Sequence, residues 1–148
     1  MTDATFAARD LEAVAALLRD LDICILTTRD GDELAARAMS NNGQVEWDGD
    51  TWFFARRDSA KIAQIEADPA VTLGYTATEQ GTWVAVEAEA EIVDDADEKR
   101  ERWFDDLKRW FENGPDDPEV VLIRAAATRV RGWSKDGEVD VRREAVRR

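Results

Sequence analysis

Two residues at the start of a short helical segment have the types needed to bind an anion. The aromatic stretch Trp52–Phe54 leads through Arg56 and Arg57 to Ser59 and Lys61, where a helix is expected to begin. Helix N-termini expose unpaired N–H groups and carry about half a positive charge. A hydroxyl and an ammonium at the same end would complete an anion seat. The same residues would also serve as an ordinary helix cap beside solvated basic side chains, and both interpretations stay open.

Missing residue types exclude several kinds of catalytic and metal site. The chain has no histidine and one cysteine, Cys24. Without histidine there is no Ser-His or Cys-His nucleophile pair, no histidine-containing zinc site and no His-ligated haem. Cys24 lies in the apolar run Ile23–Leu26, so we expect a buried structural thiol rather than a reactive one.

Adjacent acidic residues are the remaining candidates for acid–base or metal chemistry. They are Asp94-Asp95, Asp97-Glu98 and Asp116-Asp117. Such pairs in polar loops are normally solvated, and the second pair is expected to begin a helix, where negative charge suits the helix dipole. We therefore predict no metal site, and the sequence identifies no catalytic side chain. It also lacks the glycine-rich phosphate loops of nucleoside triphosphatases and dinucleotide-binding enzymes.

Length and charge limit the class of protein. The 148 residues suit one domain, and 44% hydrophobic residues are enough to bury a core. The 33 acidic and 20 basic residues give a formal net charge of −13, which disfavours nucleic-acid and anionic-membrane partners. No apolar run approaches the roughly 20 residues that span a bilayer, and the N-terminus lacks a signal-peptide pattern. A cytoplasmic protein is expected.

Three segments have the apolar spacing of amphipathic helices, namely 8–21, 60–67 and 97–113. Asp58 or Ser59 would cap the second helix, and Pro69 prevents its continuation. The third would place five large side chains along one side: Trp103, Phe104, Leu107, Trp110 and Phe111.

Short, alternating segments predict six or seven strands, mostly joined by hairpins. They are 22–28, the segment from the Asp30-Gly31 turn to Met39, 45–48, 51–55, 71–76, 82–93 and 120–133. The alternation is strictest over 82–93, which predicts one buried and one wet face. The buried face would carry Val84, Val86, Ala88, Ala90 and Ile92, and the wet face Glu87, Glu89 and Glu91.

The strand and helix pattern predicts a mainly β fold, a small antiparallel barrel with helices packed outside. The barrel domain would occupy residues 1–133. Residues 134–148 form a polar segment with no apolar stripe, for which we expect a mobile or weakly helical tail.

Five ordered motifs between Leu11 and Trp133 resemble the general stress protein 26 branch of the pyridoxamine 5'-phosphate oxidase-like family. The motifs are Leu26-Thr27-Thr28-Arg29-Asp30, Ala36-Arg37-Ala38-Met39, Trp52-Phe53-Phe54, Asp58-Ser59-Ala60-Lys61-Ile62 and the stretch Trp110–Pro118. The resemblance implies an FMN-binding split barrel with six or seven antiparallel strands in Greek-key order. It also implies a homodimer with FMN at the subunit interface.

The resemblance further implies a set of cofactor-binding residues. Arg37, Ser59 and Lys61 would hold the phosphate side of FMN, with Arg37 also able to reach the ribityl chain. The backbone of Met39 would line the ring, with contacts from Phe54 and Ala55. Trp133 and Trp110 would approach from the partner subunit.

Two departures from the family pattern affect the phosphate side. Ala38 stands where proline is common, and Ala60 stands where histidine or arginine is common. One phosphate-binding group would therefore be missing, and Arg56 or Arg57 could replace it.

The implied function is that of an FMN-dependent oxidoreductase of the general stress protein type, with an unknown small-molecule substrate. The alternatives are a non-enzymatic flavin holder or redox sensor, a relative that binds a deazaflavin, and a structural dimer with a vestigial pocket. Rapid reoxidation with turnover of an electron donor would favour the enzyme over the holder.

Overall fold

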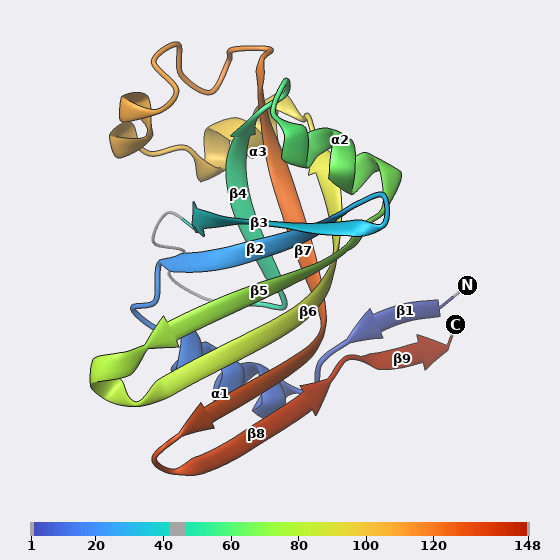
Figure 1. Ribbon diagram of the computed structural model, residues 1–148, viewed down its shortest axis with the longest axis vertical. Coiled ribbons are helices and arrows are strands. Elements are labelled where there is room, and N and C mark those ends of the chain that lie inside the picture. The colour runs from blue at the N-terminus through green and yellow to red at the C-terminus, as the bar shows by residue number, and fades with distance from the viewer. Residues whose placement is uncertain (1, 42–46, 148) are drawn as a thin grey trace.

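An antiparallel sheet of seven strands forms the body of the protein (Figure 1). The computed structural model describes residues 2–41 and 47–147. The strand order is β3-β2-β5-β6-β7-β4; β4 pairs with the first half of β7, and β8 pairs with its second half. The strands are β2 Ile23–Asp30, β3 Glu33–Ser40, β4 Asp50–Arg56, β5 Ala70–Ala77, β6 Thr82–Val93, β7 Val120–Ser134 and β8 Gly137–Arg142.

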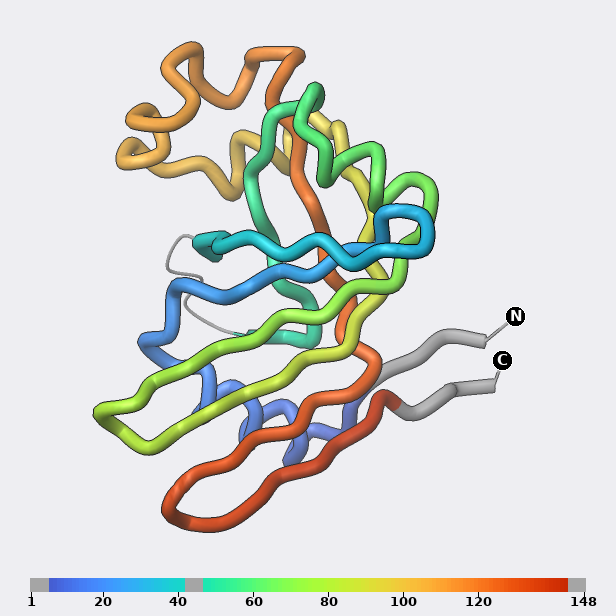
Figure 2. The backbone as a smooth tube through the Cα atoms, viewed as in Figure 1, coloured from blue at the N-terminus to red at the C-terminus, as the bar shows by residue number. Residues whose placement is uncertain are grey.

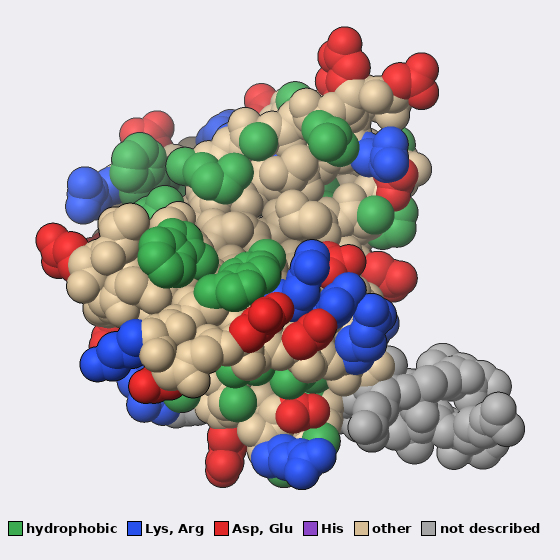
Figure 3. Space-filling view, turned by 60° about the horizontal axis from the view of Figure 1, so that its bottom comes forward, with side chains coloured by type: hydrophobic (Ala, Val, Ile, Leu, Met, Phe, Trp, Pro, Cys, Tyr) green, Lys and Arg blue, Asp and Glu red, His purple; other side chains and the backbone are tan. Residues whose placement is uncertain are grey.

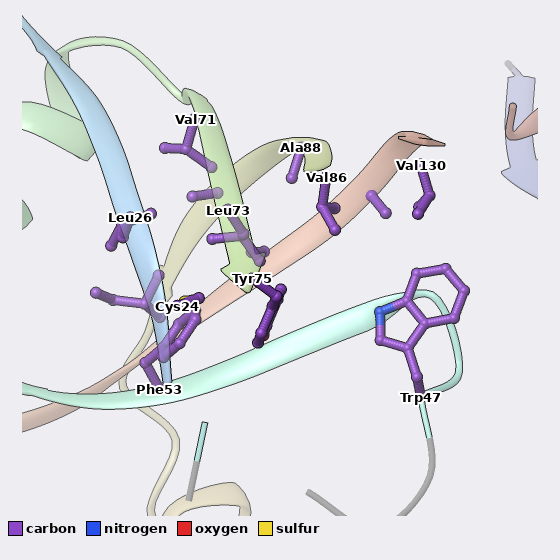
Figure 4. Close-up of a cluster of buried hydrophobic side chains, with 14 of the residues drawn as sticks. Cys24, Leu26, Trp47, Phe53, Val71, Leu73, Tyr75, Val86, Ala88 and Val130 are labelled. Carbon is purple, nitrogen blue, oxygen red and sulfur yellow. The ribbon is translucent and has the colours of Figure 1, made fainter. Parts of the chain in front are cut away.

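The sheet curls around one core but does not close. Its path ends at β3 on one side and β4 on the other, and no ladder joins these two strands in the described part of the chain. The two sides still meet in the main core, where Cys24 and Leu26 of β2, the neighbour of β3, lie with Phe53 of β4 (Figure 4). The mainly β antiparallel fold is therefore confirmed, as a curled open sheet with β3 at one edge and β4 and β8 at the other.

Helices α1, Ala8–Leu18, and α2, Ala60–Ala67, bury their apolar sides in this core. Helix α1 ends before the expected residue 21, because the chain turns at Asp20 with a φ of 66° before β2. On β7, a Cβ at Gly132 would lie 2.5 Å from Leu17 Cδ1, so glycine allows α1 to pack this closely.

Strand β6 has the predicted bounds and the predicted faces. Val84, Val86, Ala88 and Ala90 are buried, and Ile92 packs against the main core. Glu87 is half-buried, while Glu89 and Glu91 are exposed. Shifting the strand by one residue would place these carboxylates in the core, at a cost of several kcal/mol each.

The prediction of one long helix over 97–113 is wrong. The chain forms α3, Ala96–Arg102, and a separate 3-10 helix η2, Asp105–Arg109, with an extended backbone at Trp103 and Phe104 between them. The break lets Trp103 and Phe111 pack on Phe54 of β4, at ring-centroid distances of 5.5 and 6.2 Å. We call this set the outer cluster; its buried members are Phe54, Leu107, Val120 and Leu122. Figure 2 shows the segment between α3 and β7 looping away from the sheet.

Two further sequence expectations differ from the structure. The segment after residue 134 is not a mobile or helical tail, because β8 pairs with β7 and a short strand β9, Glu144–Arg147, pairs with β1, Thr2–Thr5. Arg129 binds Asp140 across the β7–β8 pair at 2.7 Å, and Val141 is buried, so pairing with the preceding strand orders this polar segment. In the expected hairpin around Gly49, Val45 and Glu46 lie outside the described residues, and β4 pairs with β7 instead.

Cys24 is buried as predicted. Burial raises the pKa of its thiol to about 11. We expect native protein at pH 8 to react with a thiol reagent such as Ellman's reagent at least about 100-fold more slowly than unfolded protein, since the thiolate is the nucleophile. Equal rates before and after addition of denaturant would contradict the burial of Cys24.

No helix in the described residues is long and apolar enough to cross a membrane.

Candidate functional site

Arg37 lies at the β3 edge of the open sheet, on the side that faces the core. It pairs in register with Leu26, so its side chain emerges beside the buried face of β2. Its guanidinium donates to the Leu26 carbonyl at 3.3 Å and to Thr28 Oγ1 at 2.9 Å. A third bond, from Nη2 to Gln64 Oε1 at 2.9 Å, connects the strand to α2. Arg37 is thus fixed beside α2 by neutral oxygen atoms.

Ser59 and Lys61 lie where α2 begins, directly after β4. Ser59 is the N-cap residue, as one of the two sequence alternatives expected. Its hydroxyl does not cap the helix, however, because Oγ donates to the Arg56 carbonyl at 2.7 Å. The side chain of Ser59 therefore does not occupy the first N–H groups of α2, of which the Ile62 N–H donates to the Ser59 carbonyl at 3.1 Å.

Lys61 and Arg37 form a pair of half-buried positive charges. Burial lowers the pKa of Lys61, and the nearby charge of Arg37 lowers it further. Burial also lowers the pKa of Arg37. No carboxylate among the described residues opposes either shift. Two cations that repel each other without a counterion provide strong electrostatic attraction for an anion.

The two arginines that could replace the missing phosphate-binding side chain, Arg56 and Arg57, interact with carboxylates instead. Arg56 Nε lies 3.6 Å from Asp58 Oδ1, and Arg57 forms an ion pair with Asp94. Arg57 also donates to the Pro118 carbonyl at 3.1 Å, which ties the start of α2 to the loop before β7. The structure therefore commits both guanidiniums to carboxylates.

The other residues expected near the ring lie on the two edge strands. Met39 packs against the main core two residues after Arg37, on the same side of β3. Ala55 is buried in the main core, and Phe54 is buried in the outer cluster. The side chains of Phe54 and Ala55 are therefore covered, and a ligand would reach them through the backbone of the β4 edge.

The structure does not bring Trp110 or Trp133 to the Arg37–Lys61 pair of the same chain. Trp110 follows η2 and is 69% exposed. Trp133 lies on the opposite, outward side of β7, directly across from Trp83 of β6; the two are 37% and 44% exposed. Figure 3 shows large hydrophobic side chains on the surface beside a group of acidic and basic ones.

The sequence motifs indicated neither Gln64 as part of the candidate site nor a role for Thr28. Gln64 Oε1 accepts from both Arg37 and Thr28 Oγ1, the latter at 2.6 Å. The available signal was the spacing, since Gln64 follows Lys61 by three residues and so shares its side of α2. In the part of the chain that the structure describes, no group of acidic or cysteine side chains could hold a metal ion.

Solved structures of similar fold cover nearly the whole chain. The general stress protein 26 from Bacillus anthracis str. Sterne is 23% identical, with a TM-score of 0.68 over 95% of this chain and 97% of that chain. A protein related to general stress protein 26 (pyridoxinephosphate oxidase family) from Clostridium acetobutylicum is 14% identical, with a TM-score of 0.74 over 90% and 94%. The general stress FMN/FAD binding protein from Xanthomonas citri is 21% identical, with a TM-score of 0.73 over 90% and 94%.

The sequence itself carries the family pattern. The comparison with curated proteins found no match. The family profile described as "Pyridoxamine 5'-phosphate oxidase like" matches residues 9–146, which spans both edge strands, α2 and β8. The chain therefore belongs to the pyridoxamine 5'-phosphate oxidase-like family.

Proposed function

We propose that the chain binds FMN and acts as a flavin-dependent oxidoreductase of the general stress protein type. The observation that carries this proposal is the Arg37–Lys61 pair, two half-buried cations without a carboxylate partner among the described residues. The FMN phosphate is a dianion that would neutralise both. The first N–H groups of α2 would add hydrogen bonds to its oxygen atoms.

The open side of the sheet suits the rest of the cofactor. Arg37 and Met39 lie on the β3 edge, Phe54 and Ala55 lie on the β4 edge, and α2 follows β4 directly. A flavin whose phosphate lies at α2 would run along these edges and contact their backbone. When bound, FMN supplies the electron or hydride transfer, while the residues of this chain bind and orient it.

We also propose that the working form is a homodimer. The outward sides of β2, β6 and β7 expose large apolar side chains, including Ile25, which is 47% exposed, as well as Trp83 and Trp133. Ile25 pairs in register with Gly74 of β5, and Gly74 pairs with Ala85 of β6, so the row carries no large polar side chain until Arg131 of β7, which pairs with Ala85. We call this surface the outer face. Large exposed apolar side chains on one face are a feature of protein–protein interfaces.

A second copy on the outer face would give the two tryptophans a role. Trp133 and Trp110 lie away from the Arg37–Lys61 pair of their own chain, so each would reach a flavin only across an interface. The composite site would then contain Arg37, Ser59 and Lys61 from one protomer and Trp133 from its partner. The cytoplasm remains the proposed location.

The colour of the purified protein tests the cofactor. We expect visible flavin absorbance and release of FMN equimolar with the chain on denaturation, identified by chromatography against riboflavin, FAD and a deazaflavin. A colourless protein that takes up no FMN on titration would contradict flavin binding. Repeated reduction by a donor and reoxidation in air would support the oxidoreductase, whereas bound FMN without turnover would support a flavin holder.

A further inference from the structure

Gln64 holds the cation at the centre of the site. Its Oε1 atom accepts from Arg37 Nη2 at 2.9 Å and from Thr28 Oγ1 at 2.6 Å. Thr28 is only 1% exposed, and its hydroxyl in turn accepts from Arg37 Nη1 at 2.9 Å. Because arginine has only donors, the oxygen of the Gln64 amide must face it. The three side chains therefore form a closed set of hydrogen bonds.

The chemistry of this set matters as much as its geometry. Every acceptor of Arg37 is neutral: an amide oxygen, a hydroxyl and the Leu26 carbonyl. A glutamate at position 64 could make the same bond to Arg37 but would cancel its charge. The amide instead fixes the guanidinium and leaves its positive charge beside Lys61 intact.

We propose that Gln64 is a positioning residue that holds Arg37 without neutralising it, and so determines the preference of the site for phosphorylated over unphosphorylated flavins. The inference rests on the proposed function, because it assigns Gln64 a role in the same FMN site. Gln64 acts through Arg37 and Lys61, and the ring edge of the ligand needs no contact with it. Its effect should therefore appear with FMN and not with riboflavin.

The test compares the dissociation constants of FMN and riboflavin in Gln64→Glu, Gln64→Leu and parent protein, measured by flavin fluorescence. Gln64→Glu should reduce the FMN-over-riboflavin preference by about 10- to 100-fold, because an ion pair replaces the free charge. Gln64→Leu should reduce it less, since Arg37 keeps its charge but loses its anchor. Gln80→Glu, an equal change of charge at an exposed residue, should leave it unchanged.

Thermal unfolding without ligand separates positioning from a merely structural role. Gln64→Glu should raise the unfolding midpoint, because the new carboxylate relieves the repulsion between Arg37 and Lys61, while a structural defect would lower it. If the parent protein prefers FMN and Gln64→Glu keeps this preference, the proposed role of Gln64 is wrong but the proposed phosphate site still stands. A parent protein that binds neither flavin, or binds both equally, would overturn the proposed phosphate site and the role of Gln64 with it.

Discussion

Replacing Lys61 with alanine should weaken FMN binding by about 10- to 150-fold, which corresponds to roughly 1.5–3 kcal/mol for a hydrogen bond to a charged group. The reason is that the Lys61 ammonium and Arg37 face no carboxylate in the described structure, so the phosphate would be their counterion. Riboflavin, which lacks the phosphate, should bind weakly to the parent protein and almost equally to Lys61→Ala. Fluorescence titration of both ligands into both proteins gives four dissociation constants. Together they form a thermodynamic cycle that isolates the interaction between Lys61 and the phosphate.

The control for Lys61 is Lys135→Ala, which removes the same charge from an exposed position in the β7–β8 turn and should change neither constant. Equal weakening of riboflavin and FMN by Lys61→Ala would mean that the lysine supports the fold or contacts the ring. In that case the phosphate would not lie at the start of α2.

Removing the charge of Lys61 should have the opposite effect, a stabilisation, on the protein without ligand. The pKa of Lys61 is lowered in the folded state by burial and by Arg37, so its charged form is less favourable there than in the unfolded chain. At pH values below that lowered pKa the folded protein carries this cost in full, and the cost disappears as the pH rises toward the unfolded value. Lys61→Met, which keeps the side-chain length, should therefore raise the unfolding midpoint at neutral pH while it weakens FMN binding.

Placing a carboxylate at Ile25 should convert the protein from a dimer to a monomer of 16.7 kDa and reduce FMN affinity by roughly tenfold or more. Ile25 lies on the outer face of β2, and Ile25→Glu would bury an unpaired charge in the proposed interface. Flavin affinity should fall because Trp133 of the second copy would be lost from the site. Light scattering at micromolar concentration and FMN titration measure the two effects.

Ala16→Glu on the exposed side of α1 adds the same charge elsewhere and should leave both mass and affinity unchanged. A parent protein that is already a monomer would refute the homodimer. If Ile25→Glu instead became a monomer with parental FMN affinity, the outer face would be an interface but the flavin site would belong to one chain.

The parts of the fold that the sequence predicted well are those in which local pattern and tertiary environment agree. Strand β6 alternates along its whole length, and each side of it meets the environment that the pattern requires. The break after Arg102 could not be predicted from spacing, because it depends on Phe54, which lies far earlier in the chain and accepts Trp103 and Phe111 from two separate pieces. Strand β8 is different, because it follows the Asp136-Gly137 turn directly after β7 and the local hairpin signal was present in the sequence.

The candidate site also contains some residues that the local sequence indicated and others that depend on distant partners. Ser59 and Lys61 are adjacent in sequence to the helix that they begin, so helix physics alone offered an anion seat there as one of two interpretations, and the seat stays a prediction. The bonds that orient Arg37 connect β2, β3 and α2 across separations of 27 and 36 residues. No short motif contains them, and only the folded sheet places Gln64 opposite Arg37.

The charged side chains beside Trp133 have a consequence for the effect of ionic strength. Arg129 and Arg131 lie on β7 against Glu87 of β6, and Arg129 also binds Asp140 of β8, so this border of the outer face is locally neutral. Screening over a Debye length of about 8–10 Å acts on unbalanced charge, which this border lacks and the Arg37–Lys61 pair has. Added salt would therefore lower the affinity for a phosphate while leaving the association of two apolar outer faces unchanged. Cofactor binding and subunit association could then be varied separately in one protein, without any substitution.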